Sequence, residues 1–192
     1  ILVTFPNRAA WSEVLRRQVC EESGLGKLNN LKYPTLAVIK GAAFGGGVGL
    51  ISCCDIALAS ENSIFSLSEV KVGLIPATIS PYVINAIGAR NARRLFTSGE
   101  RFDSNIAKQI NLVHEIAKEE DLEKRISYFI NHFKQNGPKA VIAAKKIVLD
   151  IFNKEIDDSV ISHTCEVISA LRTSKEGREG VTAFLEKRNP NW

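Results

Sequence analysis

The chain has 192 residues, of which 45% are hydrophobic and 24% are charged, and its formal net charge at pH 7 is +4. This balance is typical of a globular protein with one main domain and a modest appendage, and no apolar run approaches the roughly 20 residues that span a bilayer. The basic residues are scattered among acidic ones instead of forming blocks, which argues against a nucleic-acid partner.

The first 30 residues predict little regular structure. Residues 1–5 are typical of a short strand and residues 11–19 of a helix, whereas residues 24–32 fit either a second helix or a loop. The sequence contains no methionine and opens within the strand-like run. We therefore expect it to be incomplete at its front.

The clearest signal along the chain is a βαβ unit. Residues 35–40 form an apolar run of strand length, and five glycines follow within residues 41–49. Residues 50–54 are then typical of a helix, and residues 55–60 of a second buried strand. This order predicts two parallel strands joined by a right-handed crossover.

Helices dominate the rest of the chain. The expected elements, in order, are a strand at residues 63–67, helices at 81–89 and 91–96 that break near Gly88, a helix at 104–110 with Ser104 as its N-cap, a strand at 112–116, and helices at 119–134, 138–152, 156–171 and 175–187. Pro138 suits the first turn of its helix. The change to an all-helical pattern predicts two domains, residues 1–118 and residues 119–192.

The glycine-rich turn is a candidate oxyanion site. Gly45, Gly46 and Gly47 stand before a helix, and residues without Cβ let a ligand approach the backbone closely. The first turn of a helix presents unpaired N–H groups and the positive end of its dipole. The spacing fits neither a phosphate loop nor a dinucleotide fingerprint. Alternatively, the glycines serve only tight packing between helix and strand.

Glu69 is a candidate general acid or base. It stands between two apolar runs, residues 63–67 and residues 70–74, where partial burial would raise the pKa of its carboxyl toward neutrality. The alternative is an ordinary solvated glutamate at a loop or helix start.

The cysteines and histidines predict no further chemistry. The four cysteines form no CxxC pair, so we expect reduced thiols and a cytoplasmic protein. We expect a structural role for His114. His132 and His163 have no partner at metal-ligand spacing, and we expect no metal site.

Three ordered segments and the C-terminus resemble the crotonase family, the enoyl-CoA hydratases and isomerases. The segments are PTLAVIKGAAFGGGVGLISCCDIALAS (34–60), FSLSEVKVGLIP (65–76), FTSGERFDSNIAKQINLVHEI (96–116) and FLEKRNPNW (184–192). The resemblance implies an α/β fold, a crotonase-like spiral of ββα units with a C-terminal helical trimerisation region. It also implies a homotrimer or a dimer of trimers.

The resemblance implies an acyl-CoA substrate whose thioester enolate is held by two backbone N–H donors, with no separate cofactor. The implied catalytic residues are Gly46, as the second donor, and Glu69, as the proton carrier. The implied substrate-binding residues are Gly45, Gly47, Gly49, Pro76 and, near the coenzyme A phosphates, Lys187. The first donor belongs to a Cys-Ala-Gly-Ala-Asp-like loop that we do not find, and its place falls in or before the first 30 residues.

Gly49 leaves the type of reaction open. Family hydratases carry a second glutamate, and its position falls on Gly49. The acid of the dienoyl-CoA isomerases falls on Ala77, which argues against that branch. Residues 45–50, 67–71 and 75–82 are similar to bacterial methylglutaconyl-CoA and carboxygeranoyl-CoA hydratases, which implies a branched acyl group with a distal carboxylate and a place in leucine degradation.

We therefore expect a lyase that hydrates a branched enoyl-CoA. Two alternatives stay open at this point. One is an isomerase that uses Glu69 alone to move a proton between two carbons. The other is a non-catalytic CoA-binding protein, which the absence of the first donor loop and of a glutamate at Gly49 would explain.

Overall fold

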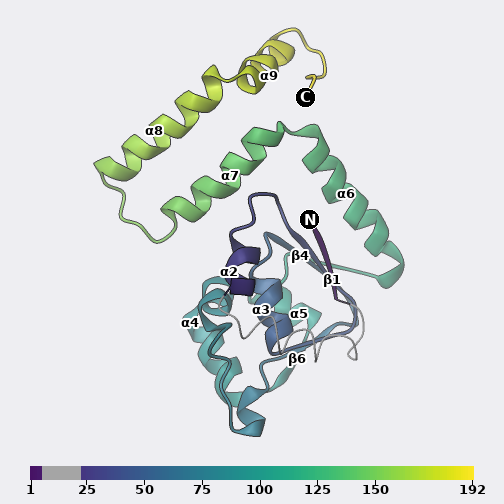
Figure 1. The fold of residues 1–192 in the computed structure, drawn as a ribbon. Helices are drawn as coiled ribbons and strands as arrows, with labels where there is room; N and C mark the ends of the chain where they lie inside the picture. The colour runs from purple at the N-terminus through teal and green to yellow at the C-terminus, as the bar shows by residue number, and fades with distance from the viewer. Residues whose placement is uncertain (6–22) are drawn as a thin grey trace. The chain divides into compact units, whose positions relative to one another are not determined.

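The computed structural model describes residues 1–5 and 23–192 of the chain (Figure 1). The helix expected at residues 11–19 lies outside the described residues. The chain divides into two compact units, Ile1–Arg125 and Ile126–Trp192, and each is described by itself. The domain boundary expected after residue 118 stays a prediction.

A parallel sheet forms the centre of the first unit. Its strand order is β1 (Leu2–Phe5), β2 (Leu36–Ile39), β4 (Ile56–Ser60) and β7 (Glu115–Ala117), and every neighbouring pair is parallel. All four residues of β2 are buried, as expected for an apolar strand that is covered on both faces. The parallel pairing of β2 with β4 confirms the expected parallel strands of the βαβ unit. The helix expected at residues 50–54 is wrong in its bounds, because α3 (Gly46–Ser52) begins within the glycine run.

The strand expected at residues 112–116 is wrong in its bounds, because β7 begins only at Glu115. Leu112 and Val113 are buried ahead of it without strand pairing. The His114 ring accepts a hydrogen bond at Nδ1 from the Ala57 N–H, at 3.0 Å, so this histidine serves the structure.

A second, smaller sheet consists of β3 (Ala42–Phe44), β5 (Ile64–Ser66) and β6 (Arg101–Asp103). β3 runs parallel to β5, and β6 runs antiparallel to it. Phe65 and Phe102 are direct cross-strand partners, and their rings stack with centroids 5.6 Å apart. β3 and β6 were not expected from the sequence, because three residues are too few to display a period.

The remaining elements of the first unit are helical. They are α2 (Ser23–Asn29), α3 (Gly46–Ser52), the 3₁₀ helix η1 (Glu69–Val72), α4 (Ser80–Ser98), α5 (Ser104–Gln109) and the 3₁₀ helix η2 (Glu119–Asp121). α4 joins the two helices expected there, and Gly88 breaks it with φ 75° and ψ 155°, which confirms the expected interruption.

Ser104 is not the N-cap of α5, contrary to expectation. Asp103 is the cap, and its Oδ1 accepts from the Ile106 N–H at 2.9 Å. The Ser104 hydroxyl is buried instead and donates to the Ser60 carbonyl at 2.7 Å. The error arises because both residue types cap helices well, so that sequence alone does not choose between neighbours.

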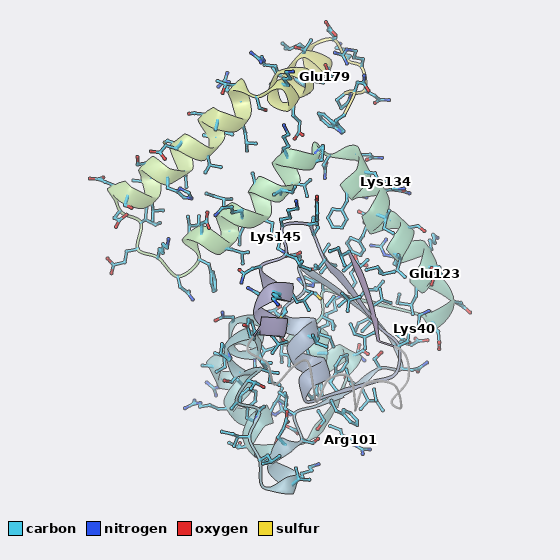
Figure 2. The ribbon with its side chains drawn as sticks, viewed as in Figure 1. Lys40, Arg101, Glu123, Lys134, Lys145 and Glu179 are labelled. Carbon is cyan, nitrogen blue, oxygen red and sulfur yellow. The ribbon has the colours of Figure 1, made fainter. Side chains whose placement is uncertain are left out.

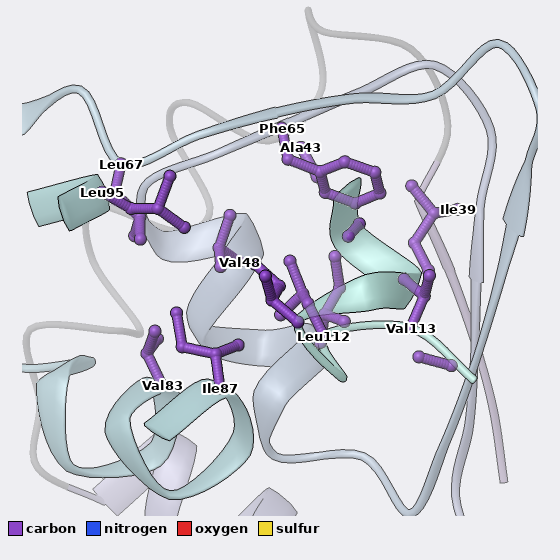
Figure 3. Close-up of a cluster of buried hydrophobic side chains, with 14 of the residues drawn as sticks. Ile39, Ala43, Val48, Phe65, Leu67, Val83, Ile87, Leu95, Leu112 and Val113 are labelled. Atoms are coloured by element: carbon purple, nitrogen blue, oxygen red, sulfur yellow. The ribbon is translucent and has the colours of Figure 1, made fainter. Parts of the chain in front are cut away.

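The core of the first unit gathers apolar side chains from both sheets and from α3, α4 and α5 (Figure 3). Its members include Ile39, Ala43, Val48, Ile51, Phe65, Leu67, Ile79, Val83, Ile87, Leu95 and Leu112. Val48 and Ile51 are each no more than 1% exposed. Burial of these two side chains fixes α3, and with it the glycine turn from which α3 starts.

The second unit is helical, with most of α6 (Leu122–Gln135), then α7 (Pro138–Ile151), α8 (Asp158–Thr173) and α9 (Lys175–Leu185). Pro138 lies in the first turn of α7, as expected. Glu176 at the start of α9 caps that turn, because its carboxylate accepts from the N–H groups of Lys139 and Ala140 at 3.0 and 2.8 Å. Glu179 of α9 pairs with Arg188 at 2.7 Å (Figure 2 labels Glu179).

Candidate active site

Two short parallel strands bring the glycine turn and Glu69 to one place. β3 ends directly before Gly45, and β5 ends three positions before Glu69. Because the carboxyl ends of parallel strands meet at the same edge of a sheet, the segments that follow them lie side by side. The Gly45 N–H donates to the Ser66 carbonyl at 2.9 Å and fastens the two segments together.

The Glu69 carboxylate lies against the backbone of Gly45. A Cβ at Gly45 would lie 2.9 Å from Glu69 Oε1 and 3.4 Å from Cδ. Gly45 also has φ 51° and ψ −116°, a conformation that is essentially restricted to glycine. Both the turn and the close approach of Glu69 therefore require glycine at this position.

Glu69 has the environment of an acid–base group. Its Oε2 is buried and has no hydrogen-bond partner among the described residues. Burial raises the pKa of the Glu69 carboxyl above its ordinary value, and a backbone hydrogen bond offsets part of that rise. A carboxyl group in this state can take up and release a proton closer to neutral pH than a solvated glutamate can.

The backbone on both sides of Glu69 fixes the position of its side chain. The Leu74 N–H donates to the Glu69 carbonyl at 3.1 Å, and Gly73 ends η1 in a left-handed conformation with φ 74°. The Ser66 hydroxyl donates to the Gly99 carbonyl at 3.3 Å. A Cβ at Gly99 would lie 3.1 Å from Val70 Cγ2, so η1 packs closely on this turn.

The start of α3 offers the hydrogen-bond donor that the sequence predicts. Gly45 is the N-cap and Gly46 is the first helical residue, so the Gly46 N–H belongs to the turn that has no partner within the helix. Gly47 is buried, but a Cβ there would meet Ala43 Cβ at an ordinary 3.8 Å. Neither backbone conformation nor packing therefore demands glycine at position 47.

Gly49 is required by tight packing, which was the alternative explanation for the glycines. A Cβ there would lie 2.7 Å from Ile79 Cβ and closer still to Ile79 Cγ2. Ile79 is buried, and its Cβ and Cγ2 atoms lie close to the backbone. They cannot move aside as the end of a long flexible side chain can. The place at which the family resemblance puts a second glutamate is therefore filled by Ile79.

The stretch from the end of η1 to Pro76 combines a buried proline with exposed apolar side chains. Pro76 is buried, whereas Val72, Leu74 and Ile75 are 73%, 63% and 71% exposed. The Arg101 guanidinium carbon lies 5.6 Å from the ring centroid of Phe44, the residue before Gly45 (Figure 2 labels Arg101). The substrate-binding role expected of Pro76 stays a prediction.

Lys187 belongs to the second unit, whereas Glu69 belongs to the first. It is exposed, follows α9 and has φ 55°, an unusual value for a residue with a side chain. The proposed contact with coenzyme A therefore stays a prediction. So does the place of the first oxyanion donor, because residues 6–22 lie outside the described part of the chain.

The described residues offer no competing metal or thiol site. Within residues 1–5 and 23–192, no group of three or more His, Cys, Asp or Glu side chains could hold a metal ion. Cys53, Cys54 and Cys165 form no disulfide, and burial raises the pKa of the Cys53 thiol to about 12. No helix in this part of the chain is both long and apolar enough to cross a membrane.

The first unit thus places a half-buried carboxylate against a glycine turn that begins a helix. The profile of the enoyl-CoA hydratase/isomerase family matches residues 12–192, so the chain belongs to that family. The expected crotonase fold is confirmed by a solved enoyl-CoA hydratase of Shewanella pealeana. It is 37% identical with a TM-score of 0.88, and the match covers 100% of this chain and 77% of that one.

Among the other similar proteins, some are named hydratases and others isomerases. An enoyl-CoA hydratase of Alternaria alternata is 29% identical over 185 residues, which are 95% of this chain and 61% of that protein. A mitochondrial Δ(3,5)-Δ(2,4)-dienoyl-CoA isomerase of Dictyostelium discoideum is 32% identical over 171 residues, which are 88% of this chain and 58% of that protein. The chain thus spans about three fifths of the length of these relatives.

Proposed function

We propose that the protein is an acyl-CoA lyase that adds water to the double bond of an enoyl-CoA. In this proposal the Gly46 N–H holds the thioester oxygen, and Glu69 moves the proton. The observation that carries the proposal is the Glu69 carboxylate, which lies against Gly45 with Oε2 buried and unpaired among the described residues. That arrangement also argues against a non-catalytic CoA-binding protein, because burying a carboxylate without a hydrogen-bond partner costs free energy, and such perturbed acids concentrate at functional sites.

The geometry suits hydration by a single carboxylate. The Glu69 carboxylate takes a proton from water while the water oxygen bonds to the β-carbon. The π electrons of the double bond move toward the thioester, whose oxygen gains negative charge and is stabilised by the Gly46 N–H. Glu69, now protonated, then delivers a proton to the α-carbon and returns to its carboxylate form.

An isomerase is the second candidate, and the contact between Gly49 and Ile79 favours it. A lone carboxylate is sufficient to take a proton from one carbon of the acyl chain and return it to another. In that reaction the thioester enolate is again the intermediate, and no water is added. The family profile, which covers isomerases as well as hydratases, is compatible with this alternative.

The acyl group proposed from the sequence resemblance is branched and carries a distal carboxylate, as in 3-methylglutaconyl-CoA, a compound of leucine degradation. We also propose a homotrimer or dimer of trimers in the cytoplasm, with no cofactor apart from the coenzyme A of the substrate. Apolar side chains on the second unit support oligomerisation, because Phe184 and Leu185 are 81% and 72% exposed in the single chain.

The test compares the protein with its Glu69→Gln variant on 3-methylglutaconyl-CoA and crotonyl-CoA, following the ultraviolet absorbance of the conjugated thioester. Glu61→Gln is a matched control, because Glu61 is an exposed glutamate outside the site. We expect hydration by the parent and the control but not by Glu69→Gln. Hydration by Glu69→Gln at the parent's rate would contradict the proposed role of Glu69.

The same reactions in deuterated water separate the two candidates. A 3-hydroxyacyl-CoA product supports the lyase. A shifted double bond without added water, seen by proton NMR, supports the isomerase and contradicts the lyase.

A further inference from the structure

Gly49 lies one helical turn beyond the residue against which the Glu69 carboxylate lies. It follows Gly45 by one helical turn, and its N–H donates to the Gly45 carbonyl at 3.2 Å. Residues four apart are neighbours on a helix surface. Since the Glu69 carboxylate lies against Gly45, the space beside Gly49 is one helical turn from that carboxylate.

A side chain at position 49 would extend toward Glu69. The Cα–Cβ bonds of an α-helix tilt toward its N-terminus, so long side chains cover the turn that precedes them. For position 49 of α3, the preceding turn is the one that begins at Gly45. An acidic side chain at this position would therefore reach the volume in which Glu69 acts.

Ile79 already occupies the first part of this path. It is 2% exposed and belongs to the core cluster, so it has no open space to move into. A Cβ at Gly49 would lie 2.7 Å from Ile79 Cβ but at an ordinary 3.7 Å from Ile79 Cα. The obstruction thus comes from the isoleucine side chain and not from the backbone.

We propose that Ile79 is a specificity-determining residue that restricts the site to one acid–base group, by filling the space through which a second carboxylate from α3 would reach Glu69. The steric part of this inference, that Ile79 fills the space beside Gly49, does not depend on the proposed function. Its chemical part, that the site has a single acid–base group, rests on the proposed function. In consequence, each proton that moves in the reaction is carried by Glu69, and the side of the site toward Gly49 is a dry, apolar wall.

The steric part is tested by the cost of Gly49→Ala in a graded series of backgrounds at position 79. Ile79→Val keeps both obstructing atoms, Ile79→Ala keeps only Cβ, and Ile79→Gly removes both. Glycine suits the backbone there, because Ile79 is the N-cap of α4. With isoleucine or valine at position 79, we expect Gly49→Ala to lower Tm by about 3–10 °C. With alanine at position 79 the decrease should be smaller, and with glycine there we expect none.

An equal cost of Gly49→Ala in all four backgrounds would overturn the inference. This measurement needs no substrate, so it stands whether or not Glu69 is catalytic. Conversely, a fully active Glu69→Gln variant would refute the proposed function and leave the Tm series untouched.

The chemical part is tested by placing a carboxylate in the vacated space. Gly49→Glu/Ile79→Gly is compared with Gly49→Gln/Ile79→Gly, which has the same size but no acid. We expect the glutamate variant to hydrate crotonyl-CoA about tenfold faster or more, and to show a second ionisation in the pH profile of kcat/KM. Gly49→Glu alone should gain nothing. Equal rates for the two double variants would contradict the proposal. If neither double variant folds, the Tm series with isoleucine, valine and alanine at position 79 still decides the steric part.

Discussion

Gly45→Ala is the substitution whose effect follows most directly from the geometry. Gly45 has φ 51° and ψ −116°, where a side chain strains the backbone by about 1–3 kcal/mol. For a chain of this length that strain lowers Tm by roughly 3–10 °C. The added Cβ would also lie 2.9 Å from Glu69 Oε1, so the carboxylate must move, and we expect activity to fall with stability.

Gly47→Ala is the matched control for stability. Its Cβ would meet Ala43 Cβ at 3.8 Å, and its φ is not positive. Replacing glycine by alanine within a helix stabilises it by up to about 1 kcal/mol, so Tm should stay or rise. Thermal unfolding followed by circular dichroism measures both variants under the same conditions.

A second background separates the two effects at Gly45. In Glu69→Ala the carboxylate is absent, so Gly45→Ala should retain the cost of backbone strain and lose the part due to the close contact. A Gly45→Ala protein as stable and as active as the parent would refute the assigned backbone conformation and the contact with Glu69.

Three further outcomes are expected. Because burial raises the pKa of the Glu69 carboxyl, the stability that this group contributes is present below the ordinary glutamate pKa and is lost as pH rises through the raised pKa. Urea titrations at several pH values should therefore find that Glu69→Gln gains stability relative to the parent as pH rises. A stability difference that does not change with pH would contradict this. Glu176→Ala removes the cap of α7 and should cost about 0.5–2 kcal/mol in the same titrations, while Glu176→Gln, which keeps one acceptor, should cost less. Lys187→Gly suits the positive φ of 55° and removes the cationic side chain, so it should raise KM for a CoA thioester without lowering Tm. An unchanged KM would exclude contact with the phosphates.

Local patterns predicted the elements whose formation depends on neighbours in the sequence. The βαβ unit around the glycine turn, the break at Gly88 and the position of Pro138 are all confirmed. Each depends on an apolar period or on a residue with a restricted backbone, and both can be read from a short stretch of chain. The candidate carboxylate was found in the same way, because Glu69 stands between two apolar runs.

Tertiary contacts account for what the sequence did not predict. β3 and β6 are strands only because β5 lies between them and pairs with both. Ile79 closes the space beside Gly49 through a contact between residues far apart in the chain, and no periodicity reports it. The sequence predicted Ser104 as the cap of α5, and only the buried hydrogen bond of Ser104 shows why Asp103 takes that role instead.

The central claim is that Glu69 exchanges a proton with a carbon next to a thioester held at Gly46, and one measurement tests it for lyase and isomerase alike. Butyryl-CoA, which has no double bond to hydrate or shift, is incubated with the protein in deuterated water, and loss of its α-proton signal is followed by NMR. We predict exchange by the parent protein and by Glu61→Gln, and none above the protein-free rate by Glu69→Gln. Exchange by Glu69→Gln at the parent's rate would contradict the account.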